Sequence, residues 1–503
     1  MGGIEVKDYQ SRFNTYTLYG FDNETLSNKN NAINPTVLYP SIYGFNSSRI
    51  PLNIAGASTT DRYRSYFFNG SYTYDSRYIL SASARKDESN LFGVKTNQKG
   101  VPLWSAGLAW NISNESFYHF DQLSYLKLRA TYGYSGNVNK SVSAYLTAQA
   151  TGQSNLWNIP YVTITNPPNP SLRWEQVRNI NFGLDFQTKS NVLSGSVEYW
   201  IKSGFDLIGA SPIAQQTGVS TFTGNTADMR GKGVDVTLNS NNLKVRDFAW
   251  STQFHFNYNT DKITSYKVKA INNGSIINGN YLQPIVGYSY YSLFSYKWRG
   301  LDNEGNPQGK LNGTTSKNYS AITNSTNIDD IEYSGTITPK YYGNIMNNFS
   351  WKALQLSVNI VYKLGYVFRR SSMSNSTLYS ATIFSASKYQ QADYDQRWQK
   401  PGDELITSVP SLIYPAIGAR DAVYSGSSAL LEKGDHIRLQ DVSLSYSMGK
   451  EMGKKSFLNN LIVYTYAANL GILWKATDRK LDPDYNEGGP LPKTISIGIK
   501  GSF

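Results

Sequence analysis

Residues 180–187 read Ile-Asn-Phe-Gly-Leu-Asp-Phe-Gln, so an apolar side chain occupies every second position. A period of two is that of a β-strand with one apolar face and one polar face. The same alternation runs through residues 126–135, 193–202, 248–258, 354–364 and 494–503. Such runs last about 9–12 residues, the length that a tilted strand needs to cross a bilayer, whereas soluble sandwich strands usually last about 5–6. The pattern predicts an all-β protein, a transmembrane antiparallel β-barrel.

Composition agrees with a barrel. The chain has 39 Tyr, 21 Phe and 10 Trp, and 14% of its residues are aromatic. Barrels place such rings in girdles at both membrane interfaces. The mean hydropathy of −0.43 is compatible with this class, because only alternate residues face lipid. No apolar run of about 18 residues exists, which excludes a helical membrane protein. Composition alone leaves an aromatic-rich soluble β protein open, and strand length decides against it.

The net charge of +12 comes from Lys and Arg that are scattered singly, without a basic block. This pattern argues against a nucleic-acid partner, and we expect these side chains in the lumen, in loops and facing lipopolysaccharide. The absence of cysteine excludes disulfides and thiolate chemistry. Residues 1–8 lack the apolar segment of a signal peptide, so we expect the natural N-terminus to lie elsewhere.

Connection lengths alternate as in outer-membrane barrels, which have short periplasmic turns and long extracellular loops. Short turns are expected at 75–77, 188–191, 240–247 and 350–353, and long loops at 137–173, 203–226, 300–339 and 367–435. Counting strands back from the C-terminus puts the turn at 240–247 on the extracellular side, whereas its short length is typical of the periplasmic side. We therefore expect an additional strand within 264–290, best placed at 275–282. With one weak strand before residue 21, the total is about 16.

The final strand ends in Phe503, in phase with Ile495, Ile497 and Ile499. An amphipathic last strand with a terminal Phe resembles the signal that the barrel-assembly machinery reads.

Four ordered stretches resemble the SusC/RagA family of TonB-dependent receptors of the Bacteroidota. Residues 169–175, Asn-Pro-Ser-Leu-Arg-Trp-Glu, followed by Asn181 to Phe186, are similar to "NPxLKWE…NxGLDF". Residues 301–307 are similar to "GLDxxTGDP", and residues 339–344 to "PKYYGG", with Asn344 in place of the second Gly. The C-terminal series "GDFLRL…NL…DPE…PLPRT" resembles residues 434–439, 469–470, 482–484 and 490–494.

The resemblance implies a plugged barrel of 22 strands in the cell outer membrane. It implies import of a glycan or peptide, a SusD-like surface lipoprotein as a lid, and a TonB partner that acts through an N-terminal segment. It covers residues 61–503 as the C-terminal part of the barrel. Residues 1–60 match poorly, as one weak strand and an extracellular loop, and the plug and TonB box are absent from the sequence. We expect the two edges of this wall to pair with strands outside it.

No catalytic, cofactor-binding or metal-binding residues are expected, and no enzyme activity. His119, His255 and His436 lack ligand spacing, and we interpret His255 and His436 as structural. Asp393 and Asp395 suggest acid–base work or calcium binding, but a solvated turn is the favoured interpretation. The sequence leaves two alternatives to transport: a surface adhesin or glycan-binding β protein, and a barrel enzyme such as a lipase.

Substrate identity and substrate-binding residues are not determined by the sequence. Trp157, Tyr161 and Trp398 are candidates to stack on sugars, or to pack on the lid or on each other. Loop 367–435 holds seven aromatic residues, which predicts that they bury against something: the loop crown itself, the lid or substrate. They are Tyr379, Phe384, Tyr389, Tyr394, Trp398, Tyr414 and Tyr424.

Overall fold

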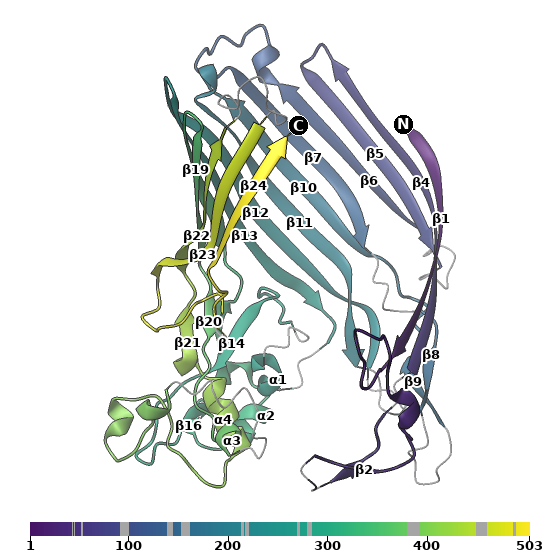
Figure 1. Cartoon of the computed structure of the whole chain (residues 1–503), viewed down its shortest axis with the longest axis vertical. Coiled ribbons are helices and arrows are strands. Elements are labelled where there is room, and N and C mark those ends of the chain that lie inside the picture. Colours follow the sequence, from purple (N-terminus) through teal and green to yellow (C-terminus); the bar gives the residue numbers. More distant parts are fainter. Residues whose placement is uncertain are drawn as a thin grey trace.

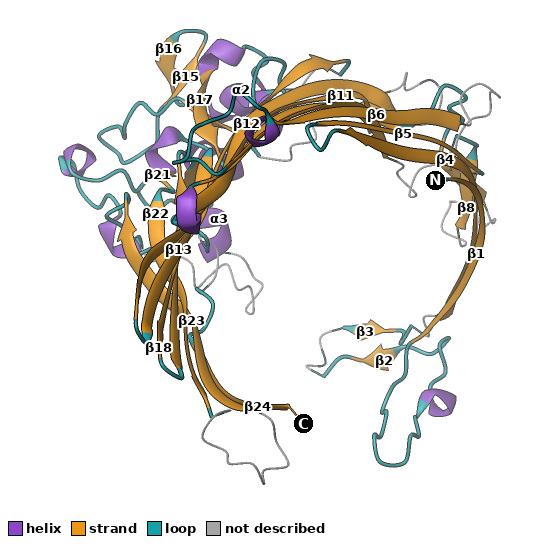
Figure 2. Ribbon diagram, turned by 90° about the horizontal axis from the view of Figure 1, so that it is seen from above, coloured by secondary structure: helices purple, strands orange, loops and turns teal. Residues whose placement is uncertain are grey.

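The computed structural model describes residues 1–503 apart from 43, 45, 52–53, 91–99, 138–143, 152–160, 213–215, 217–220, 269–271, 279–283, 380–392, 449–459, 486–488 and 503. Its main feature is one 14-stranded antiparallel sheet, which bends into an open arc (Figure 2). In order across the sheet, the strands are β1 (Gly2–Tyr16), β4 (Ile54–Tyr74), β5 (Tyr78–Ser89), β6 (Gly100–Asn111), β7 (Tyr125–Asn137), β10 (Glu175–Gln187), β11 (Leu193–Pro212), β12 (Thr221–Val245), β13 (Phe248–Tyr266), β18 (Tyr341–Trp351), β19 (Leu354–Leu364), β22 (His436–Ser447), β23 (Asn460–Lys475) and β24 (Thr494–Ser502).

The two ends of the wall differ in their connections. Both chain termini lie at one end, and the helices and small hairpins gather at the other (Figure 1). Short turns join β4 to β5, β12 to β13 and β18 to β19 at the terminal end. The connections 267–340 and 365–435 lie at the opposite end. Short periplasmic turns and long extracellular loops are the outer-membrane arrangement, so we take the helical end as extracellular.

The strand register places the apolar side chains of 180–187 on one face of the sheet. Phe182 lies between Ala130 on β7 and Tyr199 on β11. On the other face, Arg129 donates to both Asp185 and Glu198, each at 2.8 Å. Apolar residues therefore share the outer, lipid-facing side, and the ionic groups share the lumen side, as the alternation predicted.

The prediction of an additional wall strand within 264–290 is wrong for the residues that the structure describes; residues 279–282 of its best placement, 275–282, lie outside them. Residues Asn273–Ile277 form the short helix α1, in which Asn272 and Ser275 cap each other's backbone in a capping box. The later stretch Ser292–Tyr296 (β14) is extended, but it pairs with Ile331–Thr336 (β17) away from the wall. One long connection thus joins β13 directly to β18, and the turn at 240–247 lies on the periplasmic side without any added strand.

The expected loop at 203–226 is also mostly strand, because β11 and β12 extend beyond the rest of the wall as a long hairpin. Residues 169–175 support this hairpin from the side. Leu172 and Trp174 are buried beneath it with Ala144. The Arg173 side chain donates to Asp206 at 2.7 Å, and its backbone N–H donates to Asn225. The Asn-Pro-Ser-Leu-Arg-Trp-Glu motif therefore packs against the β11–β12 hairpin and stabilises it.

Both ends of the chain contribute wall strands. The weak strand expected before residue 21 is present as β1, paired with β4 along its whole length. In β24, Ile495, Ile497 and Ile499 are more than 70% exposed, as expected of lipid-facing residues. Phe503 lies outside the described residues.

The helices among the described residues are short and lie in the connections: α1, α2 (Tyr319–Asn324), α3 (Asn375–Leu378) and α4 (Gly418–Ser425). None of these described helices is long and apolar enough to cross a membrane.

The assignment of the two faces predicts the effect of a charge placed on each. Phe182→Arg should destabilise the barrel by about 2–4 kcal/mol, because it puts a guanidinium near the bilayer midplane. Leu184→Arg, nearer the periplasmic turn, should cost less. Thr131→Arg, an exposed position on the lumen face, is the matched control. Folding into lipid vesicles, measured by urea titration, separates the three, and equal midpoints for Phe182→Arg and Thr131→Arg would contradict the assignment.

Candidate functional site: the lumen wall and the extracellular lobe

The lumen face of β4–β10 carries small polar side chains in a row across the strands. Asn69 pairs with Ser83, Ser83 with Ser105, Ser105 with Gly133, and Gly133 with Asn179. A hollow of about 910 Å³ lies over this row. Gly133 has no room for a side chain, since a Cβ there would lie 2.6 Å from the Cβ of Ser105 and 2.8 Å from the carbonyl oxygen of Trp104. The floor offers hydroxyl and amide groups to a ligand.

Arg129 and Arg85 on the lumen face each pair with two carboxylates. Arg129 is shared by Asp185 and Glu198, and Glu198 also accepts from Asn181 at 3.0 Å. Arg85 bonds Asp87 at 2.6 Å and Glu5 at 3.1 Å. On β18–β22, Asn344 donates to Asn359, which donates to Asp441, each at 3.0 Å. Carboxylates outnumber arginines in these described parts of the lumen wall, which therefore suit a polar ligand that is not strongly anionic.

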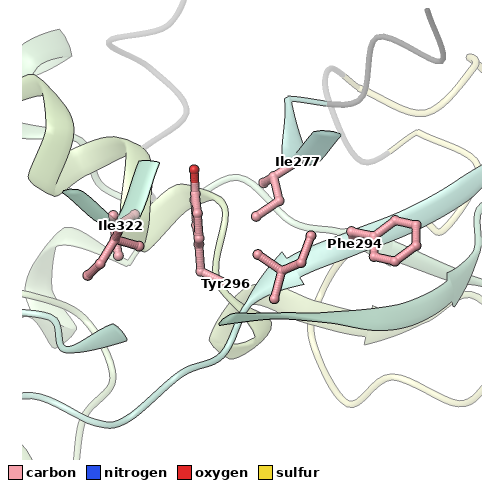
Figure 3. Packing of buried hydrophobic residues seen from close by; sticks show 6 residues of the cluster. Ile277, Phe294, Tyr296 and Ile322 are labelled. Atoms are coloured by element: carbon pink, nitrogen blue, oxygen red, sulfur yellow. The ribbon is translucent and has the colours of Figure 1, made fainter. Parts of the chain in front are cut away.

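The connections 267–340 and 365–435 fold together into one unit, here called the extracellular lobe. Its apolar core joins Ile277, Phe294, Tyr296 and Ile322 with Ile331 and Val423 (Figure 3). Val423 comes from the second connection and the others from the first. Burial raises the pKa of Tyr296 to about 12. Each connection therefore completes the core of the other.

Arg420 on α4 ties the two connections by hydrogen bonds. Its side chain is 1% exposed. It donates to the carbonyls of Gly305 and Ser411 at 3.0 Å and to the Asn306 side chain at 3.2 Å. Burial lowers the pKa of this guanidinium. The bonds hold residues 302–306 against α4.

Asp302 holds the same turn from within. It accepts from the backbone N–H groups of Glu304 and Asn306, and from the Lys317 ammonium at 2.7 Å. Burial alone would raise the pKa of Asp302, but these donors outweigh it and lower the pKa to about 2. Residues 301–307, which resemble "GLDxxTGDP", thus form a turn that is held by hydrogen bonds to the Asp302 carboxylate.

Asp393 is buried, so the expectation of a solvated turn is wrong for this residue. It accepts from Arg370 at 2.8 Å and from the backbone N–H of Met373 at 3.0 Å. Asp395, by contrast, is exposed. Asp393 is the structural ion-pair partner of Arg370, and we assign no acid–base role to Asp393 and Asp395. The sequence lacks a signal for it, because Arg370 is 23 positions away.

Residues 476–485 dock on the rim of the wall through two carboxylates. Asp482 accepts from Arg438, and Asp484 accepts from Lys363 at 2.8 Å. His436 is fully buried, with Nε2 3.3 Å from Asp484 and Nδ1 2.9 Å from the Gly434 carbonyl. Burial would raise the pKa of Asp484, but His436 and Lys363 outweigh it and lower the pKa. The structural interpretation of His436 agrees with this network.

His119, His255 and Tyr161 lie in different parts of the described structure. His255 lies in β13 with its ring 3.3 Å from Thr237, and His119 is exposed. Tyr161 begins the extracellular strand Tyr161–Asn166 (β9), and Trp157 lies outside the described residues. Within the described part of the chain, no group of three or more His, Cys, Asp or Glu residues is placed to hold a metal ion.

The aromatic residues of loop 367–435 divide into two groups. Tyr424 is buried in the lobe, Trp398 donates to Glu404 at 2.9 Å, and Tyr394 packs under Arg397. For these three, packing within the loop crown is confirmed. Tyr379 and Tyr414 meet edge to face at 5.2 Å and stay exposed. Phe384 and Tyr389 lie outside the described residues.

The turn at 399–407 presents two apolar side chains to solvent. Leu405 and Ile406 are 86% and 84% exposed. The turn itself is braced, because Asp403 accepts from the backbone N–H groups of Gln399 and Lys400, and Glu404 accepts from that of Gly402. A braced turn with exposed apolar tips has the form of an interface anchor.

An antiparallel wall with one lipid-type face, one polar face and long loops at one end defines the outer-membrane β-barrel class. The chain belongs to the "TonB dependent receptor-like, beta-barrel" family, whose sequence model matches residues 5–360.

The known relatives agree with this family assignment. TonB-dependent receptor P26 of Formosa agariphila is 25% identical over 480 residues, which cover 87% of this chain and 46% of the relative. TonB-dependent receptor SusC of Bacteroides thetaiotaomicron is 26% identical over 339 residues, covering 63% and 33%. The RagAB peptide transporter structure superposes with a TM-score of 0.72 at 23% identity, covering 91% of this chain and 49% of that one. The chain spans about half the length of the TonB-dependent receptors P26, P3 and P39 that it matches.

Arg420→Ala should loosen the lobe, because it removes the Arg420 donor from the buried carbonyl of Ser411, at about 1–3 kcal/mol. The carbonyl of Gly305 also loses one donor but keeps the backbone N–H of Ser411. Limited proteolysis should cut 267–340 and 365–435 faster by roughly tenfold or more, while the heat-modifiable mobility of the barrel stays unchanged. Arg397→Ala, on the lobe surface, is the control. Equal cleavage of both variants would show that Arg420 does not hold the lobe.

The lowered pKa of Asp302 predicts an acid dependence. Its folded-state pKa of about 2 lies below the usual value of about 3.9, so its stabilisation is present above about pH 4 and is lost as the pH falls toward 2. Asp302→Asn should remove this part of the pH dependence, whereas Asp395→Asn should keep it. Proteolysis with an acid-active protease between about pH 2 and 5 measures the difference. Parallel curves for wild type and Asp302→Asn would refute the assignment.

Proposed function

We propose that this chain forms part of the wall of an outer-membrane, TonB-dependent nutrient importer. The observation that carries the proposal is the two-faced 14-stranded sheet in a member of this receptor family. A wall with a lipid-type exterior and a hydroxyl- and amide-lined interior is built to let a polar solute pass, and transport is favoured over catalysis or adhesion. An adhesin has no need of a lipid-facing side.

The cargo that fits the lumen wall is a glycan or a peptide. Both chemistries present many hydroxyl or amide groups, which match the row from Asn69 to Asn179. Arg129 and Arg85 each face two carboxylates, which makes the wall a poor match for a highly anionic solute.

Further parts complete the importer in this proposal. The outer edges of β1 and β24, each paired with one neighbour here, pair in the membrane with other strands, because lipid offers no partner to a free backbone group. A plug and a TonB-contacting segment, which the resemblance places outside this stretch of sequence, supply the energy coupling. A SusD-like lipoprotein covers the extracellular end as a lid.

The lid proposal has a specific surface. Leu405 and Ile406 protrude from the braced turn of the lobe, at the extracellular end and away from the lipid-facing wall. Burying two such side chains in a partner is worth roughly 1.5–3 kcal/mol each. The pair therefore suits an anchor for the lid.

Uptake in a receptor-deleted strain tests the function. The full receptor that contains this wall should restore growth on its glycan or peptide only when TonB is functional. Growth without TonB would refute energised import, and growth on neither nutrient class would refute the cargo assignment.

Leu405→Ser with Ile406→Ser should reduce co-purification of the SusD-like lid about tenfold or more, with an unchanged heat-modifiable barrel. Val162→Ser, a 65% exposed position on β9, is the control for a lost apolar side chain on another loop. Normal lid retention by the double variant would rule out this anchor while leaving the import proposal intact.

A further inference from the structure

The outer face of the wall carries four cations near its extracellular edge: Arg178 on β10, Arg230 and Lys232 on β12, and Lys262 on β13. We call them the outer cation group. The register joins them: Arg178 lies opposite Ser203, Ser203 opposite Arg230, and Arg230 opposite Lys262. They form a row across four adjacent strands, with Lys232 one step below it.

This row belongs to the lipid-facing side. Along β12, Lys232 has the same parity as Val234 and Val236, which pair with Tyr258 and Phe256. Lys262 likewise shares its face with Tyr258. Arg230, Lys232 and Lys262 are exposed. The lumen-facing residues of β12, such as Asp235, have the opposite parity, and Asp235 accepts from Trp200.

The height of the group matches the edge of the apolar band. Lys262 lies twelve positions along β13 from Trp250, which stacks on Phe349 near the periplasmic turn. Twelve residues span about 40 Å of strand, or about 30 Å of height at a tilt of about 40°. The apolar band of such barrels is about 25 Å tall. The cations thus lie where the outer-leaflet headgroups begin.

No ion pair joins these four cations to a carboxylate among the residues that the structure describes. Arg178 contacts the Ser203 hydroxyl at 3.4 Å and lies over the Phe205 ring. Asp228, further along β12, accepts from the backbone N–H of Asp206. The charge of the group is therefore available to an outside anion.

The cations at the other end of the arc give an internal comparison. On the same outer face, Arg62 pairs with Asp8 at 3.1 Å, and Lys86 pairs with Glu88 at 3.2 Å. Arg64 also bonds Glu88, at 2.5 Å. Each of these three cations pairs with one of two carboxylates, Asp8 or Glu88, whereas the outer cation group has no such partner among the described residues.

We propose that the outer cation group binds the phosphate groups of a phosphorylated lipid in the outer leaflet. The inference rests on the proposed membrane placement. The headgroup phosphates lie against Arg178, Arg230, Lys232 and Lys262, while the acyl chains run down the apolar face past Val234 and Tyr258. A cation near an anionic membrane surface strengthens such binding about fivefold.

Native mass spectrometry of the purified barrel protein in detergent tests this site. The probes are bis-phosphorylated lipid A, the same lipid without phosphates, and inorganic phosphate. The variant Arg230→Gln/Lys232→Gln/Lys262→Gln should lower affinity for the phosphorylated lipid on the order of 100-fold. The matched variant Arg62→Gln/Arg64→Gln/Lys86→Gln removes the same formal charge from the carboxylate-paired cations and should keep the affinity within about fivefold. Arg230→Lys/Lys262→Arg should also bind as wild type.

Support requires that binding need both the lipid phosphates and the outer cation group. Equal binding of the dephosphorylated lipid, equal losses in the two triple variants, or unchanged binding by the first would each overturn the proposal. Binding of inorganic phosphate as tight as that of the lipid would assign a soluble-anion site instead. A barrel that folds and imports but fails this test leaves the proposed function standing, and a barrel that binds lipid but does not import fails only the function.

Discussion

The structure depends on one constraint: in lipid, each backbone N–H and C=O group needs a partner within the protein. The continuous ladder from β1 to β24 meets it strand by strand, with each strand antiparallel to its neighbours. Regular alternation follows, because a strand that pairs on both edges must send side chains to lipid and lumen in turn. The polar residues of such a strand are therefore confined to one face.

Confinement to one face explains how the charges are arranged. In the lumen, Arg129 forms ion pairs with Asp185 and Glu198 on neighbouring strands, so its charge has partners within the wall. On the outer face, the ionic groups named here lie beyond the apolar band. There the two sets differ, since Arg62 and Arg64 have carboxylate partners in the wall and Arg230 and Lys262 have none among the described residues. The same parity rule thus places paired charges on the lumen face and, at the described exterior edge, a group of cations without carboxylate partners.

The sequence predicted what is local and periodic. The lipid-facing side of Phe182, the lumen side of Asp185 and the end strand β24 followed from a period of two. Prediction from the sequence failed where the contacting residues are distant in sequence. It also failed where helix capping competes with the tendency of apolar residues to form a strand. Ile276 and Ile277 suggested a strand, but the Asn272–Ser275 capping box makes a helix whose apolar side enters the lobe core. Asp393 looked solvated because its partner Arg370 is remote in sequence.

The extracellular lobe is held together by forces that differ from those that attach residues 476–485 to the wall. Internally it has an apolar core around Tyr296 and Val423 and a buried Arg420 with several acceptors, and burial of this kind stabilises by about 1.5–3 kcal/mol per side chain. Residues 476–485 attach to the rim through ion pairs such as Lys363–Asp484, which are partly open to solvent. Ion pairs in such settings contribute about 0–1 kcal/mol each and weaken with salt. Salt therefore weakens the ionic rim contacts before it weakens the core that the two connections share.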